Sequence, residues 1–245
     1  MQPAPDPLRY VRIATLAAAV LAVALCLASG PGTRAGLWSW QAGLALVKWG
    51  FFVGAAAAIS ALALLALFAV PRFRARPGLA VLALCLARAA AAPPLALLAQ
   101  AKNVPPIHDI STDTADPPAF VGLLEERRKA PNGFAYGGEK VAARQREAYA
   151  DVKPLVLKAP PREVTQRAID AARSMGWEVV ASDAAAGRVE ATDTSAWFGF
   201  KDDVVVRVRP EGEGSRVDVR SVSRVGVSDL GANAKRIRGF LARLA

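Results

Sequence analysis

The sequence predicts an α+β protein, in which three N-terminal transmembrane helices precede a periplasmic domain with an antiparallel sheet covered on one face by helices. Two observations predict this fold class. Of the 245 residues, 53% are hydrophobic and only 21% are charged, and the apolar excess lies almost wholly before residue 100. Later segments instead alternate valine with charged residues, which is the pattern of strands with one buried face.

The chain accordingly divides into three parts. We expect a membrane domain over 1–101, a segment of loops and short helices over 102–150, and an α+β core over 151–245. The residues up to Ala99 include eight basic side chains and one acidic one, whereas those after it include 23 basic and 20 acidic. The pI near 10.2 therefore reflects the flanks of the membrane helices and does not indicate a nucleic-acid partner.

Three apolar runs are long enough to cross a bilayer, at about 13–30, 44–70 and 78–99. The first run could instead be a signal peptide that ends at the small residues 28–30. The two further runs favour a membrane span.

Arginines set the expected orientation. The first loop contains only Arg34, whereas the N-terminal tail and the second loop hold five: Arg9, Arg12, Arg72, Arg74 and Arg76. The positive-inside rule places that tail and that loop in the cytoplasm. We therefore expect a multi-pass protein of the bacterial inner membrane whose C-terminal domain is periplasmic.

The third span contains a charge that needs a partner. Arg88 lies near its middle, and Pro93 and Pro94 follow one turn later. Prolines at these positions free the carbonyls of Ala89 and Ala90, which are acceptors for a nearby guanidinium. Arg88 is expected to lock the helix bundle in this way or, alternatively, to contact a substrate or a lipid headgroup.

No metal and no cofactor is expected. Both cysteines, Cys26 and Cys85, lie in the apolar runs, so the soluble part has no thiol ligands or disulfides. His108 is the one histidine, and Asp109 follows it. Metal sites usually collect several such ligands at closer spacing.

The soluble part shows recognisable strand and helix patterns. The expected helices lie at about 118–128, 139–149, 160–176 and 228–244, and the expected strands at 153–158, 177–182, 188–195, 203–209 and 216–223. Apolar stripes of the last two helices are expected to cover one face of the sheet. The opposite face is expected to be solvated, with cross-strand pairs among Glu190, Arg207, Arg209, Arg216, Asp218 and Arg220.

A hairpin register brings polar residues together at one end of this sheet. The turn EGEG over 211–214 pairs the last two strands, and counting back places Asp202 and Asp203 opposite Ser223 and Val222. The candidate ligand-binding residues at this end are Asp202, Asp203, Ser221, Ser223, Arg224, Asp229 and Asn233. Secondary candidates are His108, Asp109, Phe200 and Arg220, and the segment 197–200 is expected to wall a pocket there.

Three strings resemble a known family. These are IHDISTDTADPPAF at 107–120, FKDDVVV at 200–206 and SVSRVGVSDLGANAKRI at 221–237, and together they resemble the bacterial domain of unknown function 1499, which also occurs behind membrane helices. The resemblance covers about Pro105 to Leu244. Tyr149, Ala150 and Asp151 depart from the pattern, in which a proline is expected in the middle. The resemblance implies no established activity.

Function is expected to be non-catalytic. We expect an envelope module that binds a partner protein, an anionic lipid or a small anionic ligand, held by Arg224 and the amides of a helix N-terminus. The alternative is a hydrolase or transferase with Asp202 or Asp203 as base and Ser221 or Ser223 as nucleophile. No histidine accompanies these serines. A purely structural polar network without a ligand is the third possibility.

Overall fold

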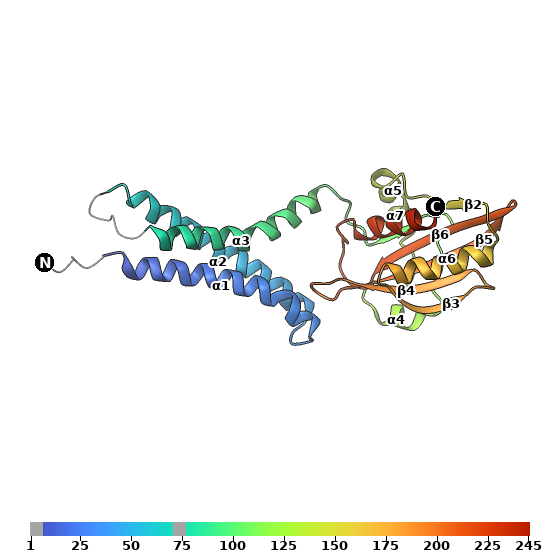
Figure 1. The fold of residues 1–245 in the computed structure, drawn as a ribbon, viewed down its shortest axis with the longest axis horizontal. Helices are drawn as coiled ribbons and strands as arrows, with labels where there is room; N and C mark the ends of the chain where they lie inside the picture. Colours follow the sequence, from blue (N-terminus) through green and yellow to red (C-terminus); the bar gives the residue numbers. More distant parts are fainter. Residues whose placement is uncertain (1–6, 71–76) are drawn as a thin grey trace. The chain divides into compact units, whose positions relative to one another are not determined.

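The computed structural model describes residues 7–70 and 77–245, so the loop with Arg72, Arg74 and Arg76 lies outside the described residues. The chain forms two compact units (Figure 1). The first comprises residues 1–99 together with Trp197–Gly199, and the second comprises Gln100–Ala196 and Phe200–Ala245.

Three long helices make up the first unit: α1 (Arg9–Arg34), α2 (Trp40–Leu67) and α3 (Gly78–Lys102). Each is long and apolar enough to cross a membrane. The three helices predicted from the apolar runs are therefore confirmed, and α1 and α3 extend beyond the predicted ends. Ser39 caps α2, because its side chain accepts a hydrogen bond from the backbone N–H of Ala42.

Small residues bring these helices together. The buried set that they share consists of Ala19, Ala57, Ala61, Ala83 and Ala87. At Gly54, an added Cβ would lie 3.5 Å from the Cβ of Ala22 and 3.5 Å from the carbonyl oxygen of Ala87. Alanine and glycine permit such close backbone approach, which allows dispersion contacts to hold helices together in an apolar solvent.

The predicted bundle lock at Arg88 is wrong. The Arg88 side chain is exposed. Pro94 does free the carbonyl of Ala90, but the group that approaches this oxygen is the Cys26 thiol, with its Sγ at 3.6 Å. Arg88 therefore lies on the outer surface of α3.

The second unit contains one six-stranded antiparallel sheet in the order β1-β6-β5-β4-β3, with β2 also paired to β6. Its strands are β1 (Asp109–Ser111), β2 (Leu155–Leu157), β3 (Glu178–Asp183), β4 (Arg188–Thr194), β5 (Lys201–Glu211) and β6 (Gly214–Ser223). The mixed α+β class with an antiparallel sheet is confirmed. The sequence did not predict β1.

The predicted hairpin register is correct. Pro210 pairs with Ser215, Asp202 with Ser223, and Asp203 with Val222. The tight turn between β5 and β6 includes Gly212 with a φ of 57°, a conformation that glycine adopts without a steric cost.

Two helices cover one face of the sheet. They are α6 (Pro161–Ser174) and α7 (Ala232–Leu244), and the rings of Trp177 and Phe240 stack within this core at 5.3 Å. Contrary to prediction, α7 begins at Ala232 rather than at Ser228 or Asp229. Leu230 and Gly231 have φ values of 54° and 81°, so the chain is left-handed there and enters the helix only afterwards.

The opposite face is also covered, so the prediction that it is solvated is wrong. Glu190 and Asp218 are 0% exposed and Arg220 is 3% exposed. Above them lies the segment that leads into α4 (Leu124–Lys129), and a second apolar cluster forms there from Phe120, Leu123, Val205 and Val222. The predicted cross-strand pairing does occur, with Arg207 and Asp218 at 3.1 Å.

Glu190 shows how this cover is held. Its two carboxylate oxygens accept hydrogen bonds from the backbone N–H groups of Val121 and Leu123, each at 2.8 Å. A second brace is Gln145 of α5 (Gly138–Ala148), whose side-chain amide bonds both backbone groups of Ser111 in β1. Buried polar side chains thus tie irregular backbone to the sheet.

Candidate functional site

The polar residues at the end of β5 and β6 separate into two groups on opposite faces of the sheet. Successive residues of a strand point to opposite sides. Asp203 consequently lies on the face that α4 covers, and Asp202 on the face that α7 covers. The hairpin brings all of them to one end, as predicted, but not into one pocket.

Asp203 is the centre of the first group. It accepts hydrogen bonds from Nε and Nη2 of Arg224 at 2.9 and 2.8 Å, and from the Thr192 hydroxyl at 2.8 Å. The Nη1 atom of Arg127 lies 3.4 Å away, and the side chains of Arg127 and Asp203 are both 0% exposed. The carboxylate is thereby surrounded by donors and holds the two guanidinium groups in place.

The pKa values of Arg224 and Arg127 shift in opposite directions. The hydrogen bonds that Arg224 donates to Asp203 raise the pKa of Arg224 above its ordinary value, whereas burial lowers the pKa of Arg127. Arg127 also leaves its Nε without a hydrogen-bond partner among the described residues. Its guanidinium carbon lies 5.6 Å from the centre of the Phe120 ring, which supplies a cation–π contact.

Arg236 is the centre of the second group. It donates to Asp202 from Nη2 at 2.6 Å, to Asp193 from Nε at 2.8 Å, and to the Ser221 hydroxyl from Nη1 at 3.1 Å. Arg236 is not among the candidate residues that the sequence predicted. The sequence spacing could have indicated it, because Arg236 follows Asn233 by three residues and therefore lies on the same side of the helix.

Asn233 is fully buried, and its amide is saturated. Its Nδ2 donates to the His108 carbonyl and to the Ser223 hydroxyl, both at 3.0 Å. Its Oδ1 accepts from the Ser221 hydroxyl at 2.6 Å and from Arg236. One side chain of α7 therefore joins the ends of β1 and β6. Its hydrogen bonds also satisfy the requirement that a buried amide has partners.

These pairings decide what the serines can do. A serine nucleophile needs a base that accepts its proton. The hydroxyl of Ser221 instead donates to an amide oxygen and accepts from a guanidinium. Within the part of the chain that the structure describes, no hydrogen bond joins Ser221 or Ser223 to a carboxylate. The arrangement is suited to holding strands and helix together.

Asp229 occupies the N-terminus of α7. Its carboxylate accepts hydrogen bonds from the backbone N–H groups of Gly231 and Asn233 at 2.8 and 2.9 Å. These two amides therefore bind an anionic side chain of the protein itself. Burial nevertheless raises the pKa of Asp229 above its ordinary value, and the two hydrogen bonds oppose that rise only partly.

The secondary candidates take up separate positions. Asp109 and Arg220 form a buried bidentate pair at 2.9 and 2.8 Å, and the Arg220 guanidinium lies 5.4 Å from the ring centres of both Phe120 and Tyr136. Burial and the charge of Asp109 raise the pKa of Tyr136 to about 12.

His108 and Phe200 take part in loop contacts. The His108 ring lies 3.3 Å from the Val227 carbonyl, and the Phe200 backbone N–H donates to the Ser195 hydroxyl at 2.9 Å. Trp197 and Phe198 do line a pocket, but it belongs to the first unit. Among the described residues, no group of three or more histidine, cysteine or acidic side chains could hold a metal ion.

Comparison with known proteins identifies the second unit. A comparison with curated proteins finds no match to the chain. A family model described as "Protein of unknown function (DUF1499)" matches residues 109–244, which is more than half of the chain and includes both polar groups at the sheet end. The chain belongs to the DUF1499 family, as a member with three helices able to span a membrane.

Proposed function

We propose that this protein is a non-catalytic binding module of the bacterial cell envelope, whose C-terminal domain binds a small anionic group at the end of β5 and β6. One observation carries the proposal. Arg224 is fixed by Asp203 through Nε and Nη2, whereas its Nη1 takes part in no hydrogen bond among the described residues. The Arg224 side chain is 21% exposed.

A guanidinium held in this way is prepared to receive an anion. Because Asp203 fixes its plane, little side-chain entropy is lost when a phosphate or carboxylate approaches the free edge. Glu126 and Glu178 also raise the pKa of Arg224, but less than Asp203 does. Both are exposed, so solvent screens their repulsion of a ligand.

Glycerol phosphate is a suitable probe, because it resembles both a lipid headgroup and a small anion. Bound ligand should raise the urea concentration at which the C-terminal domain of the full chain, in detergent, becomes sensitive to a pulse of protease. Arg224→Gln is expected to abolish this shift, whereas Arg209→Gln, at an arginine whose side chain is 41% exposed and which lies away from the sheet end, should keep it. Glu126→Gln is expected to tighten binding.

Each shift is measured within one variant, with and without the probe, so a general loss of stability does not obscure the comparison. The proposed site is wrong if the wild-type protein shows no shift, or if Arg224→Gln shows the same shift as the wild type.

The arginine distribution supports a further part of the proposal, namely that the C-terminal domain lies in the periplasm. A cysteine introduced by Glu213→Cys, in the exposed β5–β6 turn, is expected to react with a membrane-impermeant maleimide in intact spheroplasts. Arg9→Cys in the N-terminal region should react only after the membrane is permeabilised. The opposite pattern would reverse the assigned orientation.

A further inference from the structure

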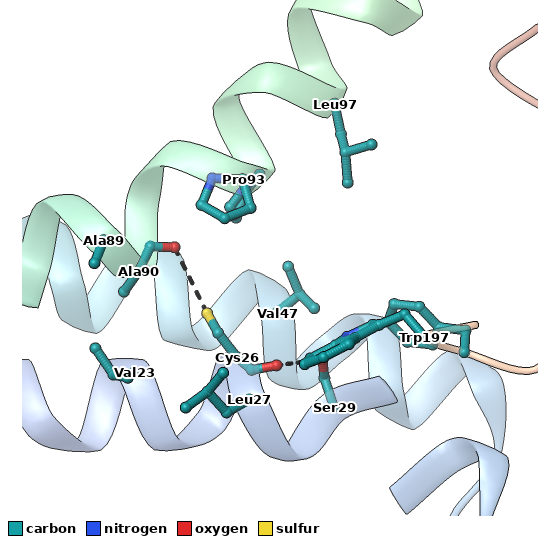
Figure 2. Close-up of a pocket in the computed structure, with 12 residues that line it drawn as sticks. Val23, Cys26, Leu27, Ser29, Val47, Ala89, Ala90, Pro93, Leu97 and Trp197 are labelled. Atoms are coloured by element: carbon teal, nitrogen blue, oxygen red, sulfur yellow. Dashed lines mark hydrogen bonds between the residues drawn. The ribbon is translucent and has the colours of Figure 1, made fainter. Parts of the chain in front are cut away.

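The first unit contains an apolar cavity of about 430 Å³. Figure 2 shows side chains from all three helices around it, among them Val23 and Cys26 of α1, Val47 of α2 and Pro93 of α3. Trp197, from the loop segment that belongs to the same unit, completes the lining.

The cavity follows from the sequence of α3. Pro93 and Pro94 lie inside this helix, where each removes a backbone hydrogen bond and its ring displaces the preceding turn. Beyond Pro93, α3 turns away from α1 and α2 (Figure 2). The alanine contacts that close the bundle before the prolines are therefore not continued after them, and a space opens.

The side-chain polar groups of Cys26 and Ser29 at the cavity are satisfied within the protein. The Cys26 thiol approaches the Ala90 carbonyl at 3.6 Å, and the Ser29 hydroxyl donates to the Cys26 carbonyl at 2.6 Å. A water molecule needs two to four polar partners in a cavity, and these walls offer few. An apolar space far larger than the roughly 150 Å³ that holds a benzene ring is instead suited to an apolar chain.

Several lining residues are also exposed on the outside of the unit, including Leu27, Ala89 and Leu97. They belong to helices with the length and composition of membrane spans. In a bilayer, the medium that reaches such side chains is lipid hydrocarbon. The cavity therefore has an opening on the side from which acyl chains can enter.

We propose that this cavity binds one acyl chain of a membrane phospholipid. Each methylene group that enters the cavity makes dispersion contacts with these apolar walls. The site does not depend on anion binding at Arg224, which lies in the second unit.

Cys26 and Cys85 provide a test within the unaltered protein. Cys26 lines the cavity, whereas Cys85 is exposed on α3 and is not among its lining residues. In the full chain in detergent, added phosphatidylglycerol is expected to slow N-ethylmaleimide alkylation of Cys26 at least about fivefold and to leave Cys85 unchanged. Glycerol phosphate, which lacks the chains, is expected to protect neither thiol.

A second measurement uses lipid that remains bound during purification. Mass spectrometry of the intact wild-type protein is expected to show one retained phospholipid per chain. Ala89→Phe, which fills the cavity, should lower that fraction at least tenfold, while Ala92→Phe, at an exposed alanine of the same helix outside the lining, should retain it.

Equal alkylation of Cys26 with and without phospholipid overturns the proposal, as does protection by glycerol phosphate alone. Equal lipid retention by Ala89→Phe and Ala92→Phe also overturns it. If Ala89→Phe does not fold, the thiol measurement decides the matter on the wild-type chain.

Discussion

Replacing Asp203 with alanine is expected to lower the free energy of unfolding of the C-terminal domain by about 3–5 kcal/mol. The substitution would leave the buried guanidinium of Arg127 without its carboxylate partner. Arg127 is fully buried and has Asp203 as its ionic partner, and the remaining acceptors of its guanidinium are backbone carbonyls. An uncompensated cation would then remain in the interior of the domain, where the cost of desolvation is no longer offset.

The measurement is urea-dependent pulse proteolysis of the full chain, which reports unfolding of the C-terminal domain separately from the helices in the micelle. The matched control is Asp151→Ala. Asp151 pairs with Arg238 at 2.5 Å, but their side chains are 62% and 43% exposed, so its loss should cost less than about 1 kcal/mol. Equal losses in the two variants would contradict this account of the buried network.

Asn233→Ala is expected to cost about 3 kcal/mol, because several buried groups lose their partners at once. The Ser221 hydroxyl and the His108 carbonyl both bond this amide inside the domain. The same proteolysis assay measures the loss. Gln166→Ala is the control, since the Gln166 amide donates to Asp170 on an exposed surface, and it should change stability by less than about 0.5 kcal/mol.

A loss below about 1 kcal/mol for Asn233→Ala would mean that the hydrogen bonds around it contribute little. Asn233→Asp provides a further check. It retains the acceptor towards Ser221 and Arg236 but removes both donors, so we expect a stability between those of the alanine variant and the wild type.

Local patterns in the sequence were sufficient for much of the fold. The helices of the first unit follow from long apolar runs, and the β5–β6 register follows from a glycine turn and alternating valines. Asn233 lies among the buried residues on one side of α7, so its burial follows from the same kind of local pattern. In each case neighbouring residues determine the structure, so their spacing carries the information.

Features that depend on distant segments were not predicted. Glu190 alternates with apolar residues in β4. This sequence pattern does not distinguish a glutamate that faces water from one that bonds the backbone of Val121 and Leu123, as Glu190 does. The covering segment lacks a helical or strand period, so nothing local indicated that it lies on the sheet. Arg127 likewise appeared in a short charged helix, where an exposed side chain is the ordinary expectation.

The positive φ values of Leu230 and Gly231 explain the error at the start of α7. Ser228 and Asp229 have the composition of a helix cap, and Asp229 does bond the helix amides. It does so from further back in the chain, because a left-handed turn intervenes. Leucine rarely adopts that conformation, so the sequence contained no sign of it.

The place of β6 in the sheet has a consequence for biogenesis. Both β1 and β2 pair with β6, which is synthesised after them. Until Ser223 has been synthesised and delivered, these early strands have no neighbour, and the chain behind the third helix stays open to proteases and chaperones. Folding of this domain is therefore expected to wait for the synthesis of β6, in one late step that the β5–β6 hairpin begins.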